Sequence, residues 1–289
     1  ENTFDMPELP EVETMRRGLE KIVGLRIHSV SFPAAKRLRS LLFKPSPQRL
    51  KTRLLSLVIT GIRRIGKRIV IDFNSDESLV IEPRMTGLLL LANSPSPEHN
   101  RVEICFDDSS VHPLIYWDRR GLGTVQLLSV HTMSILFNSN RIGPDALLIT
   151  AEDLQCRLGR SRRPVKVALL DQRGLSGIGN IYASEILFRA QIHPRAPCNR
   201  LLPQAWGRLH ESIQSVLREA IQLKGSTLSD ATYRTPQNRS GGFQFHHRVY
   251  GKQGTSCFVC GNPIERFVQA QRATFACPTC QNMRFLRKL

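Results

Sequence analysis

The segment 174-GLSGIGNIYASEILF-188 decides how the middle of this chain folds. Its glycines interrupt one helix and permit a tight turn: Gly174, Gly177 and Gly179. Asn180 then opens a second helix, whose apolar face consists of Ile181, Ile186 and Leu187. Unpaired amides at a glycine-flanked helix start form a seat for an anion. The segment therefore predicts a helix–turn–helix with an anion seat, and a plain connection of two helices without a ligand is the alternative.

The residues around this segment extend the helical pattern. Thr150, followed three residues later by Asp153, is typical of a capped helix start, and apolar residues recur at helical spacing as far as Leu223. We therefore expect a helical domain from about residue 144 to 224. Residues 226–243 are polar and contain glycine without a sustained period, so they predict a long loop, and such loops are often functional.

Two cysteine pairs near the C-terminus have the spacing of a metal site. Their members are Cys257, Cys260, Cys277 and Cys280. Two-residue spacing lets both thiolates of a pair bind one ion, and four thiolates complete a tetrahedral zinc site, with an iron–sulfur cluster as the alternative. Four protein sulfurs leave no open position for substrate. We therefore expect one structural Zn²⁺, a ribbon with Arg272 at its tip, and a reducing compartment.

The N-terminal half has a different period. Apolar residues from Leu9 to Val23 recur at helical spacing and predict an amphipathic helix over about 8–23, which Gly24 ends. From residue 26 the apolar residues alternate, as in 67-KRIVIDF-73 and 102-VEICFDD-108, which predicts short antiparallel strands. A β-sandwich or flattened barrel behind one leading helix follows, so the fold class is α+β.

The composition is strongly basic. The chain of 289 residues has 41 Lys and Arg against 24 Asp and Glu, a net charge of +17 and a pI of about 10.3. This excess suits a polyanionic partner, with nucleic acid favoured over an anionic membrane, and a merely basic, ribosome-like protein as the alternative. No apolar run approaches the ~18 residues of a membrane span, and no secretory signal is expected.

Four motifs, taken together, resemble the formamidopyrimidine-DNA glycosylase family. They are 7-PELPEVETMRRGLE-20, 177-GIGNIYASEILFRA-190, 248-RVYGK-252 and 271-QRATF-275 inside the cysteine ribbon. The resemblance runs from Pro7 to about Cys280 and implies three parts. They are a catalytic β-sandwich over 7–135, a helix–two-turn–helix domain with a lesion-capping loop over 144–242, and a zinc finger over 243–289.

The family's activity is bifunctional. Its members excise oxidised purines, such as 8-oxoguanine and formamidopyrimidines, from duplex DNA and then cut the strand at the abasic site by β- and δ-elimination. The resemblance thus implies a base-excision-repair DNA glycosylase with abasic-site lyase activity. Its expected partner is damaged double-stranded DNA, with no membrane. We expect a monomer in the cytoplasm or nucleoid of a bacterium, or in the nucleus or an organelle of a eukaryote.

The resemblance also implies the catalytic residues. As an N-terminal residue, Pro7 carries a secondary amine that attacks C1′ and forms an iminium, which acidifies C2′–H and permits elimination of the phosphates. Glu8 matches the proton donor and acceptor at the sugar, Glu11 a second acid near the base, and Lys67 a hairpin lysine that grips phosphate beside the lesion. From the residues alone, each glutamate is equally a carboxylate stabilised by a helix dipole.

Further positions match residues that contact DNA in the family. The void left by an extruded nucleotide would be filled by Met85, Arg120 and Leu122. Phosphates would be bound by Lys67, Lys166, Asn180 and Arg272. The loop 226–243 resembles the lid over 8-oxoguanine, which favours the oxidised-purine branch over endonuclease VIII.

Three features depart from the family pattern. Gly121 and Leu122 stand where a second arginine and a phenylalanine are common, and Glu82 occupies a position often held by histidine. Residues 1–6, ENTFDM, precede Pro7, and we interpret them as a cloning remnant or a mis-set start in front of a native Met6. An amide-bonded proline nitrogen cannot form an iminium, so a chain that keeps these residues is expected to be silent in catalysis. The alternative function is therefore a catalytically silent protein that binds lesions or abasic DNA.

Overall fold

The computed structural model describes residues 7–33, 41–138 and 141–283, so the expectation about residues 1–6 lies outside the described part. Contacts group the chain into two compact units, each made of separated segments. The sandwich unit comprises Leu9–Asn138 and Leu223–Gln244. The helical unit comprises the residues up to Glu8, Ser139–Gln222 and Phe245–Leu289.

Two sheets form the sandwich unit, as the alternating segments predict. The four-stranded sheet has the order β1 (Ile27–Ser31), β7 (Asn100–Phe106), β8 (Leu114–Asp118) and β6 (Gly87–Leu90). The five-stranded sheet has the order β2 (Leu42–Lys44), β9 (Thr124–Ser129), β5 (Glu77–Glu82), β4 (Arg68–Phe73) and β3 (Ile59–Ile65). Neighbouring strands are antiparallel except β2 and β9.

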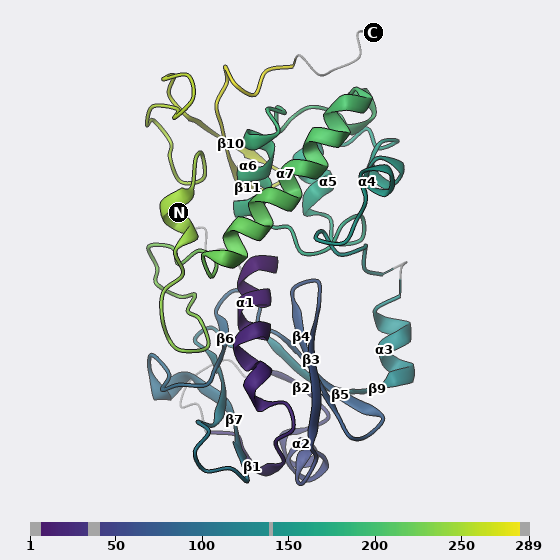
Figure 1. The fold of residues 1–289 in the computed structure, drawn as a ribbon, viewed down its shortest axis with the longest axis vertical. Helices are drawn as coiled ribbons and strands as arrows, with labels where there is room; N and C mark the ends of the chain where they lie inside the picture. Colours follow the sequence, from purple (N-terminus) through teal and green to yellow (C-terminus); the bar gives the residue numbers. More distant parts are fainter. Residues whose placement is uncertain (1–6, 34–40, 139–140, 284–289) are drawn as a thin grey trace. The chain divides into compact units, whose positions relative to one another are not determined.

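The helices of this unit follow the predicted pattern at the N-terminus. They are α1 (Leu9–Leu19), continued by the short η1 (Glu20–Ile22), then α2 (Pro47–Leu54), η2 (Pro97–His99) and α3 (Val130–Leu136). Val12, Met15 and Leu19 recur on one face of α1 and are fully buried. This face contacts β3, β4 and β6, along which α1 runs in Figure 1.

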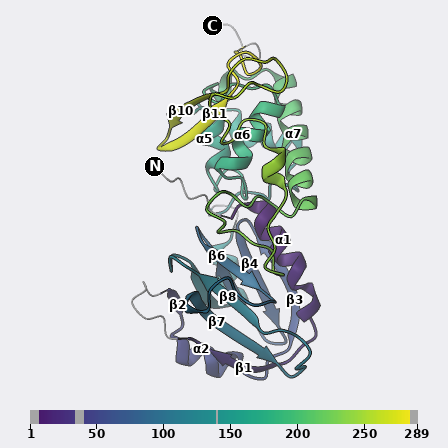
Figure 2. The ribbon, with the colours of Figure 1, turned by 90° about the vertical axis from the view of Figure 1, so that its left-hand side faces the viewer.

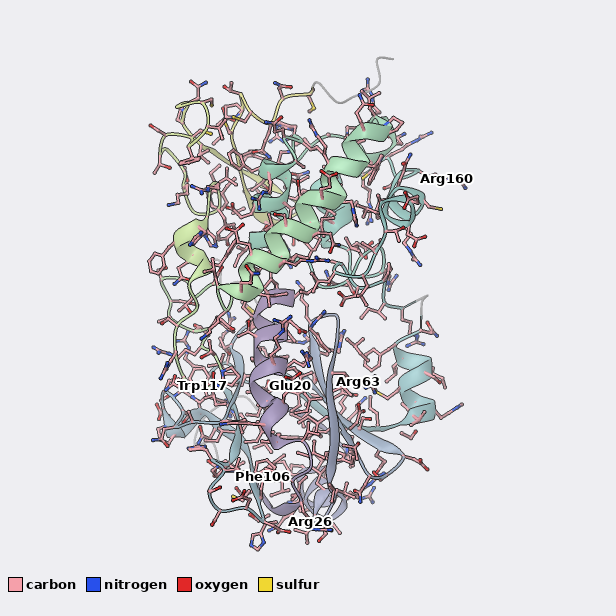
Figure 3. All side chains as sticks on the ribbon, in the orientation of Figure 1. Glu20, Arg26, Arg63, Phe106, Trp117 and Arg160 are labelled. Carbon is pink, nitrogen blue, oxygen red and sulfur yellow. The ribbon has the colours of Figure 1, made fainter. Side chains whose placement is uncertain are left out.

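One hydrophobic core joins the two sheets and α1. Alternating residues of β7 that end at Phe106 belong to this core, as do consecutive residues of β8 that end at Trp117; Figure 3 labels both. A smaller cluster under α3 contains Val70, Val80, Leu128 and Met133. The predicted sandwich with a leading helix is confirmed.

The helical unit contains the predicted capped helix start. Its helices are α4 (Ala151–Leu158), α5 (Val165–Leu170), α6 (Asn180–Arg189), η3 (Cys198–Arg200) and α7 (Pro203–Gln222). The Thr150 hydroxyl accepts a hydrogen bond from the Asp153 amide at 3.1 Å, which is the expected cap of α4. Among the described residues, no helix combines the length and apolar character that crossing a bilayer requires.

The cysteine ribbon packs against these helices and is not a separate unit. Its strands β10 (Glu265–Gln269) and β11 (Arg272–Ala276) are antiparallel, and β11 contacts α6, beside which it lies in Figure 2. After α7, residues 223–242 form the predicted loop, which leads into η4 (Phe243–His246).

The grouping by contacts divides the chain differently from the expected domain boundaries. The loop 223–244, placed by the sequence in the helical domain, belongs to the sandwich unit because its backbone bonds lie there, for example from the Leu91 amide to the Pro236 carbonyl at 2.8 Å. The predicted boundary at 242/243 also separates the ribbon from helices that it contacts.

Candidate functional site

The anion seat at the start of α6 is occupied by the chain's own carboxylate. Glu8 accepts hydrogen bonds from the amides of Gly179 at 2.7 Å, Ile181 at 2.9 Å and Tyr182 at 3.4 Å. A Cβ atom at position 179 would lie 2.3 Å from Glu8 Cδ, which explains why glycine stands there. The predicted seat is thus confirmed in place, and its anion is Glu8.

This arrangement sets the chemistry of Glu8. Amide donors and the positive end of α6 favour the ionised carboxylate, and they hold it in one orientation. The dipole that stabilises Glu8 is that of α6 and not that of its own helix α1, as the residues alone suggested. Pro7 immediately precedes Glu8 in the chain, so a proton acceptor of defined orientation adjoins the expected nucleophile.

Asn180 lies at the same helix start. It is the first residue of α6, and it is buried, with 4% of its surface exposed. Its Oδ1 has no hydrogen-bond partner within the described part of the chain. A buried acceptor without a partner costs about 1–3 kcal/mol.

Lys166, expected to bind a phosphate, lies inside the helical unit. This side chain on α5 is fully buried, and its Nζ donates to the Ala273 carbonyl and to Thr274 Oγ1, both at 2.9 Å. The ammonium group therefore joins α5 to β11. Burying an ammonium requires such partners, because desolvation of the charge is costly. Lys166 holds the strand that begins with Arg272.

The ribbon brings together the four predicted zinc ligands. All four ligand sulfurs lie within 4.8 Å of one another, and Cys257–Cys280 and Cys260–Cys277 are 3.9 and 3.4 Å apart. Tetrahedral sulfurs at ~2.3 Å from zinc lie about 3.8 Å from one another, so the cage fits this ion. Arg272 is exposed and follows the turn between β10 and β11.

In the sandwich unit, Lys67 occupies the turn between β3 and β4. Gly66 takes a positive φ of 59° there. Arg64 donates to the Gly66 carbonyl at 3.0 Å and to Glu13 Oε2 at 3.1 Å, so it ties this turn to α1. Burial alone would raise the pKa of Glu13, but hydrogen bonds from Arg16, Arg17 and Arg64 outweigh it and lower that pKa.

Glu82, the unexplained departure, has two arginine partners. Its carboxylate lies 3.2 Å from Arg68, which follows Lys67, and 3.8 Å from Arg84, which precedes Met85. Arg68 comes opposite Glu82 because Ile69 pairs with Ile81 across β4 and β5. A negative charge on this basic surface is therefore neutralised within the protein.

The expected void-filling residues lie in two connections between strands. Met85 is half-buried in the turn between β5 and β6. Arg120 is exposed and Leu122 is half-buried in the connection between β8 and β9. Both apolar residues thus lie outside regular strands, as their turn sequences predicted.

Glu11 and the long loop also lie in this unit. Glu11 Oε1 accepts a hydrogen bond from the Ser226 amide at 2.8 Å, where the loop begins. Gly225 has a φ of +77°, and a Cβ there would lie 2.7 Å from Glu11 Oε1. Tyr233 is buried, and its hydroxyl donates to the Lys224 carbonyl at 3.1 Å. The carboxylate expected near the base therefore anchors the expected lid.

Sequence reasoning missed two buried acids. Glu185 on α6 accepts from the amides of Arg248, Val249 and Tyr250 at 2.8–3.0 Å, which secures the 248-RVYGK-252 motif. Burial raises the pKa of Glu185 to about 7, although these amides and nearby positive charges act in the opposite direction. Asp118 at the end of β8 is the second such acid and is fully buried. An acid within an otherwise apolar segment is the signal that could have found both.

Sequence profiles of known families match three parts of the chain. The formamidopyrimidine-DNA glycosylase N-terminal domain matches residues 6–125, and the H2TH domain of the same glycosylase matches residues 142–232. The zinc finger found in FPG and IleRS matches residues 257–282. Together these matches cover more than half of the chain.

Individual relatives extend over nearly the whole length. A formamidopyrimidine-DNA glycosylase of Solibacter usitatus is 39% identical over 276 residues, which cover 96% of this chain and 99% of the relative. A point mutant of the Lactococcus lactis FPG, solved in complex with Fapy-dG-containing DNA, is 35% identical, with a TM-score of 0.83, over 95% of this chain and 99% of that one. The MutM (FPG) protein of Thermus thermophilus is 36% identical, with a TM-score of 0.81, over 95% and 98%.

Proposed function

The chain belongs to the formamidopyrimidine-DNA glycosylase family and is a zinc-containing base-excision-repair glycosylase with abasic-site lyase activity, and on this premise we propose that Pro7 and Glu8 carry its chemistry. The observation behind the proposal is the carboxylate of Glu8, which three amides at the start of α6 hold beside Pro7. A carboxyl group held in one orientation next to a potential secondary amine is the pair that this reaction needs.

The steps follow from these two groups. The neutral Pro7 amine attacks C1′ of the damaged nucleotide and becomes a positively charged ammonium as the bond from C1′ to the base breaks, and the departing base takes a proton from solvent. Glu8 accepts the ammonium proton and passes it to the ring oxygen of the sugar as the ring opens, which leaves an iminium between Pro7 and C1′. The positive nitrogen withdraws electrons, so C2′–H loses its proton and the 3′ phosphate leaves, followed by the 5′ phosphate.

The remaining predicted residues serve the DNA. Met85, Arg120 and Leu122 fill the space of the extruded nucleotide, and Glu11 lies on the side of the damaged base. Lys67, Asn180 and Arg272 bind phosphates, whereas Lys166 supports the ribbon that presents Arg272. The zinc is held by the four ribbon cysteines and stabilises that ribbon.

The partner of this site is a damaged DNA duplex. A Lactococcus lactis relative has been solved with abasic-site DNA as well as with Fapy-dG DNA, at 34–35% identity to this chain. The net charge of +17 favours such a polyanion. The enzyme acts on it as a monomer.

The test compares a chain that begins at Pro7 with the chain that begins at Glu1. Both are incubated with a duplex containing 8-oxoguanine, and borohydride reduces any iminium to a stable crosslink. We expect excision, strand cleavage and crosslinking from the Pro7-start chain, whose amine is available. The Glu1-start chain should bind abasic DNA without a crosslink, as a silent lesion-binding protein would. Crosslinking by a chain that mass spectrometry shows to retain residues 1–6 would move the nucleophile to a lysine, with Lys67 the first to test.

A further inference from the structure

One buried carboxylate receives hydrogen bonds from both connections that carry the proposed void-filling residues. Asp118 Oδ1 accepts from the Thr86 hydroxyl, which is adjacent to Met85, and from the amides of Arg120 at 3.1 Å and Gly121 at 3.0 Å. Its Oδ2 accepts from the Gly123 amide at 2.9 Å. The side chain is fully buried at the end of β8.

The two connections also approach each other closely around Tyr116. A Cβ atom at Gly87, after the Met85 turn, would lie 2.8 Å from the Tyr116 hydroxyl, and one at Gly123 would lie 1.8 Å from it. This hydroxyl in turn donates to Asp118 Oδ2 at 3.4 Å. Glycines on both sides therefore allow the backbones to close on a shared polar centre.

Because Asp118 is buried, its carboxylate needs these hydrogen bonds. An ionised carboxylate removed from water must be paired or hydrogen-bonded, and the donors here come from the two connections themselves. The Arg101 guanidinium, also buried, donates to the Asp118 carbonyl at 2.8 Å and adds a positive charge nearby. If either connection moved away from Asp118, the buried carboxylate would lose hydrogen bonds, which is costly.

The geometry points to Asp118 as a positioning residue that makes the two void-filling connections one rigid wedge. Met85 is linked to Asp118 through the hydroxyl of its neighbour Thr86. Arg120 and Leu122 are linked to it through backbone amides of the second connection, those of Arg120 and Gly123. This inference rests on the proposed function, because it assigns a support to residues that fill the vacated space. A wedge of fixed geometry lowers the cost of extruding a stacked base, and an abasic sugar has no base to unstack.

The test uses Thr86→Val and Asp118→Asn in the Pro7-start chain. Thr86→Val removes the hydroxyl that donates to Asp118 and accepts from the Arg120 amide at 3.0 Å, while the second connection keeps its own hydrogen bonds to Asp118. Asp118→Asn replaces one acceptor oxygen by an amino group that faces N–H donors. We expect each variant to slow single-turnover excision of 8-oxoguanine from a duplex about tenfold or more, while cleavage of a preformed abasic site changes by less than about threefold.

Two further measurements make the result decisive. Fluorescence of a 2-aminopurine placed opposite the lesion reports unstacking, and its increase on binding should shrink in both variants. Asp72→Asn is the matched control, because Asp72 on β4 also binds a hydroxyl, that of Ser78 at 2.5 Å, but no amide of either connection. It should excise within about twofold of the parent.

Thr86→Val keeps the inference testable if Asp118→Asn does not fold. Unchanged excision in Thr86→Val, or an equal loss with duplex and abasic substrates, would overturn the rigid wedge. A parent chain that excises nothing would instead contradict the proposed function, so the two failures are distinguishable.

Discussion

At the scale of single residues, a substitution of Glu8 should distinguish two steps, base excision and cleavage at the abasic site. Glu8→Gln in the Pro7-start chain removes the proposed proton shuttle but leaves the amine, so we expect base excision to fall about 100-fold. Cleavage of a preformed abasic site should fall much less. Single-turnover assays on the two substrates measure the difference, and equal losses would contradict the shuttle role.

Gly179 offers a second test that leaves the reacting groups unchanged. A methyl group at this position would lie 2.3 Å from Glu8 Cδ, while the backbone φ of −128° is acceptable to alanine. Gly179→Ala should therefore displace the carboxylate and lower excision about 100-fold. The matched control is Gly207→Ala, where no atom lies within 4 Å of the added carbon on α7. That variant should keep full activity and unfold at a higher temperature, since alanine favours a helix by about 0.5–1 kcal/mol.

At the scale of elements, Lys166 and Arg272 affect DNA binding through different physics. Lys166→Met removes the buried tie between α5 and β11, so we expect weaker binding to lesion and undamaged duplex alike, with an unchanged dependence on salt. Arg272→Ala removes an exposed charge and should flatten the log–log salt slope by about 0.9. Titrations over a range of salt concentrations distinguish the two. A flatter slope in Lys166→Met would restore Lys166 as a phosphate contact.

On the strand pair β4–β5, we expect a substitution that strengthens DNA binding instead of weakening it. Glu82 holds Arg68 and Arg84 beside the Lys67 turn and the Met85 turn. Glu82→Gln should release both arginines to the DNA, so affinity for undamaged duplex should rise and the salt slope should steepen by up to about 0.9 per arginine. Glu20→Gln is the control. Glu20, which follows α1, likewise forms an ion pair with an arginine, Arg16. A rise of similar size in both variants would show only the effect of net charge.

Sequence reasoning succeeded for elements with local causes. The helix α1, the strands around Lys67, the Thr150 cap and the paired cysteines depend on neighbours within a few positions, which a pattern records. The partners of Glu8 and Lys166 could not be found in this way. The bonds from Glu8 to Gly179 and from Lys166 to Ala273 join residues 171 and 107 positions apart. The resemblance implied a phosphate contact for Lys166, but its partners on β11 could be seen only in the folded chain.

At the scale of the whole molecule, loss of the zinc should affect DNA binding without unfolding the sandwich unit. The zinc ligands lie in the helical unit, while the core of the sandwich unit contains none of them. Removal of zinc by a chelator should therefore abolish tight duplex binding and leave the β-sheet circular dichroism nearly unchanged. Restored binding after zinc is added back is the control. Tight binding by metal-free protein would contradict the role of the ribbon.

The interleaving of the two units has a consequence for synthesis on the ribosome. The chain contributes Pro7 and Glu8 to one unit, then 130 residues from Leu9 to Asn138 to the other, and it returns to that second unit only at Leu223–Gln244. Domains usually fold as they emerge from the exit tunnel. Here the Glu8 carboxylate cannot accept its hydrogen bonds from the start of α6 until residues 179–182 have been translated, and Glu11 cannot accept that of the Ser226 amide until Ser226 has emerged. The proposed catalytic end of the nascent chain is thus completed only after most of its message has been read.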